Sequence, residues 1–182
     1  MKIQFTSGFA NKVYKGGKLL KYETNGSSGI DLRSISILEQ GEKSRKWLLR
    51  QDEDKALINT EGEENPVFIK EYILNPNARA LVFSGICASI EKGTEIQIRA
   101  RSGLSWKNGV TILNSPATID SDYRGEIGSM VINSSKEPFT ITAGLRVSQI
   151  VVAPIIVAQI EYTDQLDQTD RGESGFGSTG IL

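Results

Sequence analysis

Short segments in which hydrophobic and polar residues alternate, or in which β-branched residues dominate, follow one another along most of the chain. The clearest of them are residues 80–90, 95–99, 126–132, 139–142 and 147–160. Turn residues at 75–77 and 136–138 separate some of these segments. The pattern predicts an all-β fold, an antiparallel sandwich or jelly roll, rather than alternating strands and helices. Helix is scarce, and residues 102–107 indicate one short helical turn.

The segment 39–71 departs from this pattern. It is rich in charged residues, has weak periodicity and contains Gly62 and Pro66. We expect an excursion from the sandwich, with a hairpin or short helix around residues 45–57. We interpret it as a solvated surface insertion.

The C-terminal segment 163–182 is polar and rich in glycine, so alone it should be mobile. It nevertheless carries Arg171, Phe176, Ser178 and Thr179, which could bind phosphate and stack on a planar ring. We therefore divide the chain into a β domain, residues 1–162, and a flexible C-terminal lid, residues 163–182, that orders on an anionic ligand. Plain disorder is the alternative interpretation of this segment.

The composition excludes several kinds of chemistry. The chain has 182 residues, enough for one domain with a core, and its net charge is −1. No overall field therefore draws it to nucleic acid or to an anionic membrane. It contains no histidine, which removes Ser-His-Asp triads and histidine zinc sites. A general base must then be Asp, Glu, Lys or Tyr.

The cellular compartment can be argued from two features. Cys87 is the one cysteine and lies in an apolar run, which favours a buried structural thiol in a reducing compartment. No segment approaches the ~20 apolar residues that span a bilayer. We expect a cytoplasmic protein, or a nuclear one if the source is eukaryotic, with neither a membrane nor a nucleic-acid partner.

Two internal segments carry groups that suit phosphate chemistry. Arg101, Ser102 and Gly103 follow the predicted strand 95–99, so a guanidinium, a hydroxyl and main-chain N–H groups could meet one oxyanion. A capping turn with Ser102 as the N-cap is the alternative. Residues 114–126 predict two turns with Asp120 between them, and this segment alone favours a structural turn over a catalytic carboxylate.

Five segments taken together, in their order along the chain, resemble the five motifs of the trimeric dUTPase family. They are residues 29–32, 101–104 with 107–109, 114–126, 144–149 and 171–180. The resemblance covers about residues 24–38 and 73–182, so segment 39–71 lies outside it. It implies a distorted jelly roll that forms a homotrimer, with the C-terminal tail exchanged between subunits. It also implies hydrolysis of dUTP to dUMP and pyrophosphate with Mg²⁺ as cofactor, which limits uracil incorporation into DNA and supplies dUMP for thymidylate synthesis.

The resemblance also implies catalytic roles for single residues. Asp120, and not Asp122, holds and activates the water that attacks the α-phosphorus in line. Asp31 contacts Mg²⁺ through water, while the phosphates hold the metal directly. Arg171 completes the catalytic set from the tail. Tyr123 packs beneath the sugar and leaves no room for a 2′-hydroxyl.

The remaining matched positions bind the substrate in this resemblance. Those that pair with or surround the uracil edge are Asn114, Thr118 and Ile119. Those at the phosphates are Arg101, Ser102 and Gln149, with Gly103 beside them. Those of the tail that closes over the γ-phosphate and base are Phe176, Gly177, Ser178 and Thr179.

Two other functions stay under consideration. A dCTP deaminase shares the fold and the tail, but it needs a glutamate in the strand after the third motif, where this chain has Met130. It also lacks the Asp122-Tyr123 pair. A regulator with a dUTPase-like fold, in which segment 39–71 binds a protein partner, remains compatible with five intact motifs. The departures within the motifs, such as Ala117 in place of the usual glycine, remove no charged or nucleophilic group.

Overall fold

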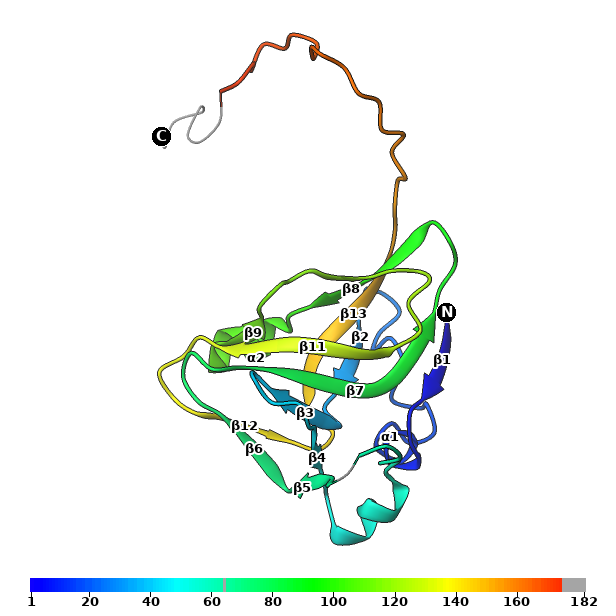
Figure 1. The fold of residues 1–182 in the computed structure, drawn as a ribbon, viewed down its shortest axis with the longest axis vertical. Helices are drawn as coiled ribbons and strands as arrows, with labels where there is room; N and C mark the ends of the chain where they lie inside the picture. Colours follow the sequence, from blue (N-terminus) through cyan, green and yellow to red (C-terminus); the bar gives the residue numbers. More distant parts are fainter. Residues whose placement is uncertain (64, 175–182) are drawn as a thin grey trace.

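The computed structural model of the protein describes residues 1–63 and 65–174 (Figure 1). Its elements in chain order are β1 (Lys2–Phe5), α1 (Gly8–Val13), β2 (Ile30–Arg33), β3 (Ser36–Glu39), β4 (Lys46–Leu48), the 3₁₀ helix η1 (Asp52–Leu57), β5 (Val67–Ile69), β6 (Glu71–Leu74), β7 (Arg79–Ser89), β8 (Thr94–Arg99), α2 (Ser102–Asn108), β9 (Val110–Ile112), β10 (Ala117–Ile119), β11 (Glu126–Asn133), β12 (Phe139–Thr142) and β13 (Arg146–Pro154). The all-β class predicted from the alternating segments is confirmed.

The strands form three sheets. A seven-stranded sheet follows the order β5-β4-β3-β7-β11-β9, with β1 also paired to β7. A four-stranded sheet follows the order β10-β8-β13-β2, and β12 pairs with β6 in a two-stranded ribbon. Every pairing is antiparallel except that of β4 with β5. The long strand β7 is central, because β11 lies along one of its edges and β3 and β1 along the other.

The core lies where the alternating apolar faces of the two large sheets meet. Ile96 and Ile98 of β8 and Ile150 of β13 are buried on the side of the four-stranded sheet. Burying each such side chain contributes about 1.5–3 kcal/mol to folding. Between the sheets, the hydroxyls of Ser129 in β11 and Ser148 in β13 form a buried hydrogen bond of 2.7 Å. The polar pair is therefore satisfied inside the core, and it links the two sheets.

Most of the predicted elements are confirmed, and one is too long. Strands form at the predicted segments 80–90, 95–99, 126–132 and 139–142, and the helical turn predicted at 102–107 is α2. The strand predicted for 147–160 ends at Pro154, opposite Thr94, where its neighbour β8 begins. Beyond that point no strand among the described residues lies alongside, and the chain leaves the body as an exposed arm (Figure 1). Cys87 is free, as expected, but only partly buried.

Helix α1 was not predicted, because its apolar residues occupy less than two turns. Ser7 begins it as the N-cap, and its side chain accepts a hydrogen bond of 3.1 Å from the Ala10 N–H. Phe9 and Val13 are fully buried against the sheet. No helix among residues 1–63 and 65–174 is long and apolar enough to cross a membrane.

The interpretation of segment 39–71 as a solvated surface insertion is wrong for its central part. The hairpin or short helix expected around 45–57 is present as β4 and η1. However, Trp47, Leu48 and Leu49 are at most 4% exposed. β4 extends the seven-stranded sheet by pairing with β3, so this part of the segment belongs to the sandwich. A charge-rich composition hid three consecutive apolar residues that pack into the core.

A buried carboxylate ties this segment to α1. The Asp54 side chain is 0% exposed. Its Oδ1 accepts a hydrogen bond of 2.6 Å from Lys12 Nζ, and its Oδ2 accepts from the N–H groups of Arg50 and Gln51 at 3.2 and 3.1 Å. Burial by itself raises the pKa of the Asp54 carboxyl, but the bonds from Lys12 and from the two N–H groups outweigh it. The pKa of Asp54 therefore lies below its ordinary value.

The Asp54→Asn variant should lose about 2 kcal/mol of unfolding free energy near neutral pH, because the buried amide nitrogen cannot accept the hydrogen bonds that one of the two carboxylate oxygens now accepts. A carboxyl with a depressed folded-state pKa stabilises the protein above its unfolded-state pKa, and this contribution is lost as the pH falls through the folded value. The difference in unfolding free energy between wild type and variant, measured by urea denaturation, should hold steady above about pH 5 and shrink below about pH 4. Asp52→Asn, at the exposed start of the same helix, is the control. A difference that stays constant down to strongly acidic pH would show that Asp54 is not the group responsible.

Candidate active site

The first cluster of candidate residues forms where β2, β13 and the end of β8 meet. Asp31 of β2 lies opposite Gln149 of β13. Asp31 Oδ1 accepts a hydrogen bond of 2.8 Å from Arg101 Nε, and Oδ2 accepts one of 3.1 Å from Arg146 Nη1. Arg101 Nη1 also donates to the Arg146 carbonyl at 3.1 Å. The carboxylate thus holds two guanidiniums, which would otherwise repel each other, on one side of the sheet.

Gln149 is held beside this cluster by main chain. Its Nε2 donates to the carbonyl of Ala100 at 2.9 Å, one residue before Arg101. Gly29 packs against the same side chain: a Cβ at that position would lie 2.3 Å from Gln149 Oε1. A side chain at position 29 would therefore displace the Gln149 amide, so glycine here keeps the amide in place.

The segment after β8 turns into α2, with Arg101 rather than Ser102 as its N-cap residue. The capping turn considered for Ser102 is therefore shifted by one residue. The Arg101 side chain makes no capping bond, because a guanidinium has no acceptor; it donates to Asp31 instead. Ser102 and Gly103 are both exposed in the first turn of the helix, and no atom lies within 4 Å of a Cβ built on Gly103. Their hydroxyl and N–H groups can be reached from solvent.

The third-motif segment runs from the loop between β9 and β10, which lie in different sheets, to β11. Asn114 is exposed in this loop, whereas Thr118 and Ile119 belong to β10, which pairs with β8. Asp120 follows directly and is exposed, and its carbonyl accepts from the Tyr123 N–H at 3.1 Å in a tight turn. Asp120 lines an open cavity of about 620 Å³; the other residues lining it are Ile90, Lys92, Ser121, Asp122 and Arg124.

Tyr123 is 44% exposed, and its ring folds back along the following residues. Its hydroxyl donates to the carbonyl of Glu126 at 3.3 Å. A Cβ on Gly125 would lie 2.2 Å from the Tyr123 hydroxyl oxygen, so a side chain at 125 would displace the ring. Reasoning from the sequence did not identify Glu126 or Arg146 as part of this machinery. Arg146 could have been found, because it lies inside the fourth motif segment.

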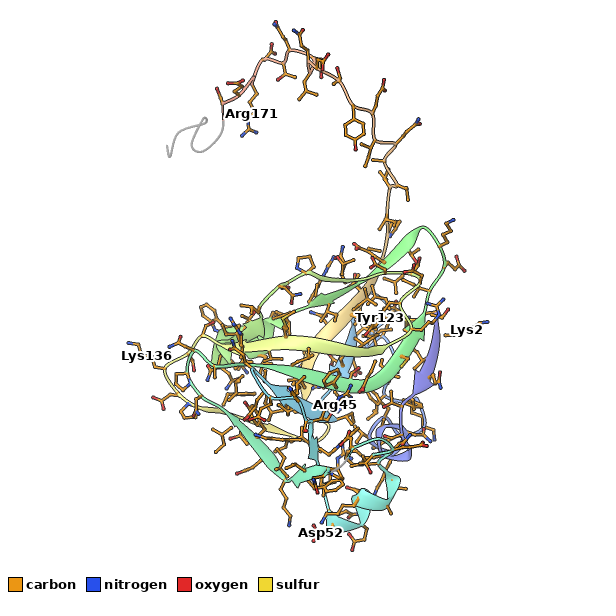
Figure 2. All side chains as sticks on the ribbon, viewed as in Figure 1. Lys2, Arg45, Asp52, Tyr123, Lys136 and Arg171 are labelled. Atoms are coloured by element: carbon orange, nitrogen blue, oxygen red, sulfur yellow. The ribbon has the colours of Figure 1, made fainter. Side chains whose placement is uncertain are left out.

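The tail is not brought to these residues within one chain. Arg171 is exposed on the extended arm, and Figure 2 shows it far from Tyr123. Phe176, Gly177, Ser178 and Thr179 lie outside the described residues. Among residues 1–63 and 65–174, no side-chain hydrogen bond joins Asp120 to the cluster around Asp31. One chain therefore presents two separate clusters and a distant Arg171.

No part of the described chain forms a protein cage for a metal: it contains no group of three or more His, Cys, Asp or Glu side chains placed to hold one. Each Asp31 oxygen accepts one arginine hydrogen bond, which leaves capacity for another. Asp31 therefore fits contact with a metal through water better than direct ligation.

Comparison with known proteins gives the family. The family model for dUTPase matches residues 67–180, which is more than half of the chain. The chain belongs to the dUTPase family. It is 39% identical over 180 residues to the deoxyuridine 5'-triphosphate nucleotidohydrolase of Roseobacter denitrificans, covering 99% of this chain and 95% of that protein. The resemblance seen in the five motif segments is thereby confirmed.

Solved dUTPase structures share the fold. The dUTPase of Staphylococcus bacteriophage 80alpha, solved with dUPNHPP, superimposes with a TM-score of 0.66 at 19% identity, over 99% of this chain and 98% of that one. A dUTPase from phage phi11 of S. aureus, described with a structural Mg(II) ion, has a TM-score of 0.63 at 16% identity, over 92% and 98% of the two chains. At these identities the likeness concerns the fold, and it confirms the dUTPase-like all-β architecture.

The two ion pairs of Asp31 should differ in strength. Arg101 is closer to Asp31 and less exposed than Arg146, with 27% against 43% of the side chain accessible. Double-mutant cycles with Asp31→Asn, Arg101→Met and Arg146→Met should therefore give a coupling of about 1–2 kcal/mol for Asp31–Arg101 and below about 1 kcal/mol for Asp31–Arg146. Urea denaturation at one fixed protein concentration measures both couplings. Equal couplings, or a larger one for Arg146, would contradict this ranking.

Proposed function

We propose that the Asp31 cluster and the Asp120 cavity are parts of one site, at which dUTP is hydrolysed. The reaction follows from the family: the chain is a dUTP diphosphatase, which hydrolyses dUTP to dUMP and pyrophosphate. The observation that carries the assignment of residues is the position of Asp120, a solvent-accessible carboxylate on the wall of an open cavity. In a chain without histidine, a carboxylate is one of the few groups that can serve as general base.

Asp120 accepts a proton from the attacking water in this proposal. The water attacks the α-phosphorus in line with the leaving pyrophosphate, and the carboxylate orients it as well as taking its proton. Phosphoryl transfer needs positioning and neutralisation of charge more than covalent help from the protein. One accessible carboxylate is therefore enough as the general base, while other groups of the site neutralise the charge of the phosphates.

The triphosphate is bound by the cluster around Arg101. A guanidinium has five N–H donors, and Asp31 and the Arg146 carbonyl engage those at Nε and Nη1. Its other nitrogen makes no side-chain bond among the described residues and can donate to a phosphate oxygen. Ser102 and Gly103 add an accessible hydroxyl and N–H groups beside it, and Gln149 borders them through its bond to Ala100.

Magnesium fits this site as a partner of the nucleotide. The metal would be held by phosphate oxygens and water, with Asp31 accepting a hydrogen bond from its water shell. When bound, Mg²⁺ neutralises charge on the triphosphate and lowers the cost of bringing the base Asp120 near it. Asp31 is already oriented for this contact by its two arginines.

Substrate selection is assigned to the third motif and the tail. Asn114, in the loop between β9 and β10, and Thr118 and Ile119, in β10, border the uracil edge, and Tyr123 lies under the sugar. Arg171, Phe176, Gly177, Ser178 and Thr179 close over the nucleotide. Because Arg171 lies far from Tyr123 in one chain, we propose a homotrimer in which the tail of one subunit completes the site of another. The exposed apolar arm supports this assembly, since Ile156 and Tyr162 are each 96% exposed.

The dCTP deaminase alternative is not supported by the structure around Met130. This residue is 43% exposed in β11, and it presents no acid or base where the deaminase needs a glutamate.

Pyrophosphate release from dUTP, dTTP, dCTP and UTP, each with and without Mg²⁺, tests the function. Release should be fast with dUTP and Mg²⁺. It should be at least about 100-fold slower with each other nucleotide, because the site selects both base and sugar, and also without the metal, because the charge of the triphosphate is then not neutralised. Ammonia released from dCTP would point to the deaminase instead. Hydrolysis of UTP as fast as of dUTP would remove the role given to Tyr123.

The Asp120→Asn variant should lower kcat about 10²- to 10⁴-fold with little change in nucleotide affinity, because the amide keeps its shape but cannot take a proton. Asp122→Asn is the matched control, since Asp122 lines the same cavity and should lose far less. Steady-state kinetics with dUTP and binding of a non-hydrolysable dUTP analogue separate the two effects. Equal losses in the two variants would overturn the assignment of the base.

A further inference from the structure

Glu126, the first residue of β11, stabilises a β-bulge in the central strand β7. Its pairing with β7 shifts register between Glu126 and Gly128, and Gly85 lies in the stretch of β7 that bulges there. Gly85 has φ +72°, and a Cβ on it would lie 2.6 Å from the Ala10 Cβ, so only glycine fits. Glu126 Oε1 accepts a hydrogen bond of 2.7 Å from the Gly85 N–H. The carboxylate therefore satisfies an N–H that the bulge removes from the ladder.

The same residue also holds the proposed sugar-contacting tyrosine. The Tyr123 hydroxyl donates to the Glu126 carbonyl, and the ring lies against Gly125. Any shift of the main chain at 125–126 must therefore move the ring. The side chain of Glu126 fixes that main chain to β7, and its carbonyl fixes the tyrosine.

The second oxygen of Glu126 is bound by a residue from outside the five motifs. Arg45 Nη1, from the segment 39–71, donates to Glu126 Oε2 at 2.5 Å. The guanidinium also lies over the Phe83 ring, 3.6 Å from its centroid. Arg45 is thus held between an aromatic face on β7 and a carboxylate on β11.

The ion pair between Arg45 and Glu126 matters because the Glu126 carboxylate is almost buried. The Glu126 side chain is only 9% exposed, so its negative charge has little access to water. Without Arg45, one N–H group would be left to hold an almost buried carboxylate, which is unfavourable. Glu126 would then turn toward solvent, and this change loosens the segment 123–126.

We propose that Arg45 is a positioning residue for Tyr123: by neutralising Glu126, it holds the main chain on which the tyrosine rests, and so sharpens selection of deoxyribose over ribose. This inference rests on the proposed role of Tyr123 in the dUTP site. It assigns the charged insertion a part in the specificity of the reaction, through contact with the third motif rather than with the nucleotide.

The neighbouring residue offers a matched control. Lys46, next to Arg45 in the chain, pairs with Glu39 at 2.5 Å, and the two side chains are 28% and 30% exposed. The pair is similar in length, but it joins the neighbouring strands β4 and β3, and Glu39 has no bond to the third motif. Lys46→Met therefore removes a comparable ion pair from the insertion without touching Glu126.

The test compares kcat and KM for dUTP and UTP in wild type, Arg45→Met, Arg45→Lys and Lys46→Met. In Arg45→Met, kcat/KM for dUTP should fall about tenfold, mainly through KM, while that for UTP falls less, so the preference for dUTP narrows about fivefold. Arg45→Lys should recover part of the preference because it restores the charge. Lys46→Met should match wild type. An unchanged preference in folded Arg45→Met would overturn the inference.

A second measurement does not depend on turnover. Hydrogen exchange of the peptide covering residues 121–127 should speed up at least about threefold in Arg45→Met and stay unchanged in Lys46→Met. In the Glu126→Gln background, where the charge is gone, adding Arg45→Met should change neither exchange nor preference further. Exchange equal to wild type in Arg45→Met overturns the inference even if that variant folds poorly elsewhere. Absence of dUTP hydrolysis by the wild type would instead overturn the proposed function, and the exchange data would still decide whether Arg45 holds this segment.

Discussion

The register of the two large sheets is the constraint on which the other features depend. One apolar face of each strand is buried between the sheets, and a slip of one residue would turn that face to solvent. In β2 the buried residues Ile30 and Leu32 flank the partly exposed Asp31, and in β13 Ser148 and Ile150 flank Gln149. The packing of the core therefore decides that the polar residues of the first and fourth motifs emerge on the same side. No separate interaction is needed to aim them.

Partly buried ion pairs arrange the charged side chains around the proposed site. Asp31 holds the Arg101 side chain in place without a ligand, so that, in the phosphate-binding role we propose for it, the guanidinium would lose little further conformational entropy. Glu126 holds the end of the third-motif segment to β7 by accepting a hydrogen bond from the Gly85 N–H, with Arg45 as its counter-ion. Both carboxylates are less than 15% exposed, whereas Asp120 is exposed, as suits the role of general base that we propose for it. Asp31 and Asp120, which are the same type of residue, thus differ in their surroundings.

The charged segment 39–71 illustrates how composition can mislead. Its charged residues suggested a solvated loop, yet Leu48 is fully buried and Asp54 is buried with its bonds satisfied. Charged side chains inside a fold are stable when each has a partner, and here the partners come from α1 and β11. The insertion is joined to the rest of the molecule by ion pairs that span long stretches of sequence.

Local patterns in the sequence determined the fold class, the strands β7, β8, β11, β12 and the start of β13, and the family, because alternation, turn residues and short motifs are encoded within a few consecutive positions. They also brought out Asp120, Tyr123 and Gln149, since each lies inside a motif segment. Tertiary structure alone decided where β13 ends, because a strand ends where its neighbour does, and that neighbour lies more than fifty residues earlier in the chain. It also decided that Asp31 is shared by two arginines and that Arg45 pairs with Glu126. These contacts join positions far apart in the sequence, and no local pattern specifies which charges meet once the sheets have packed.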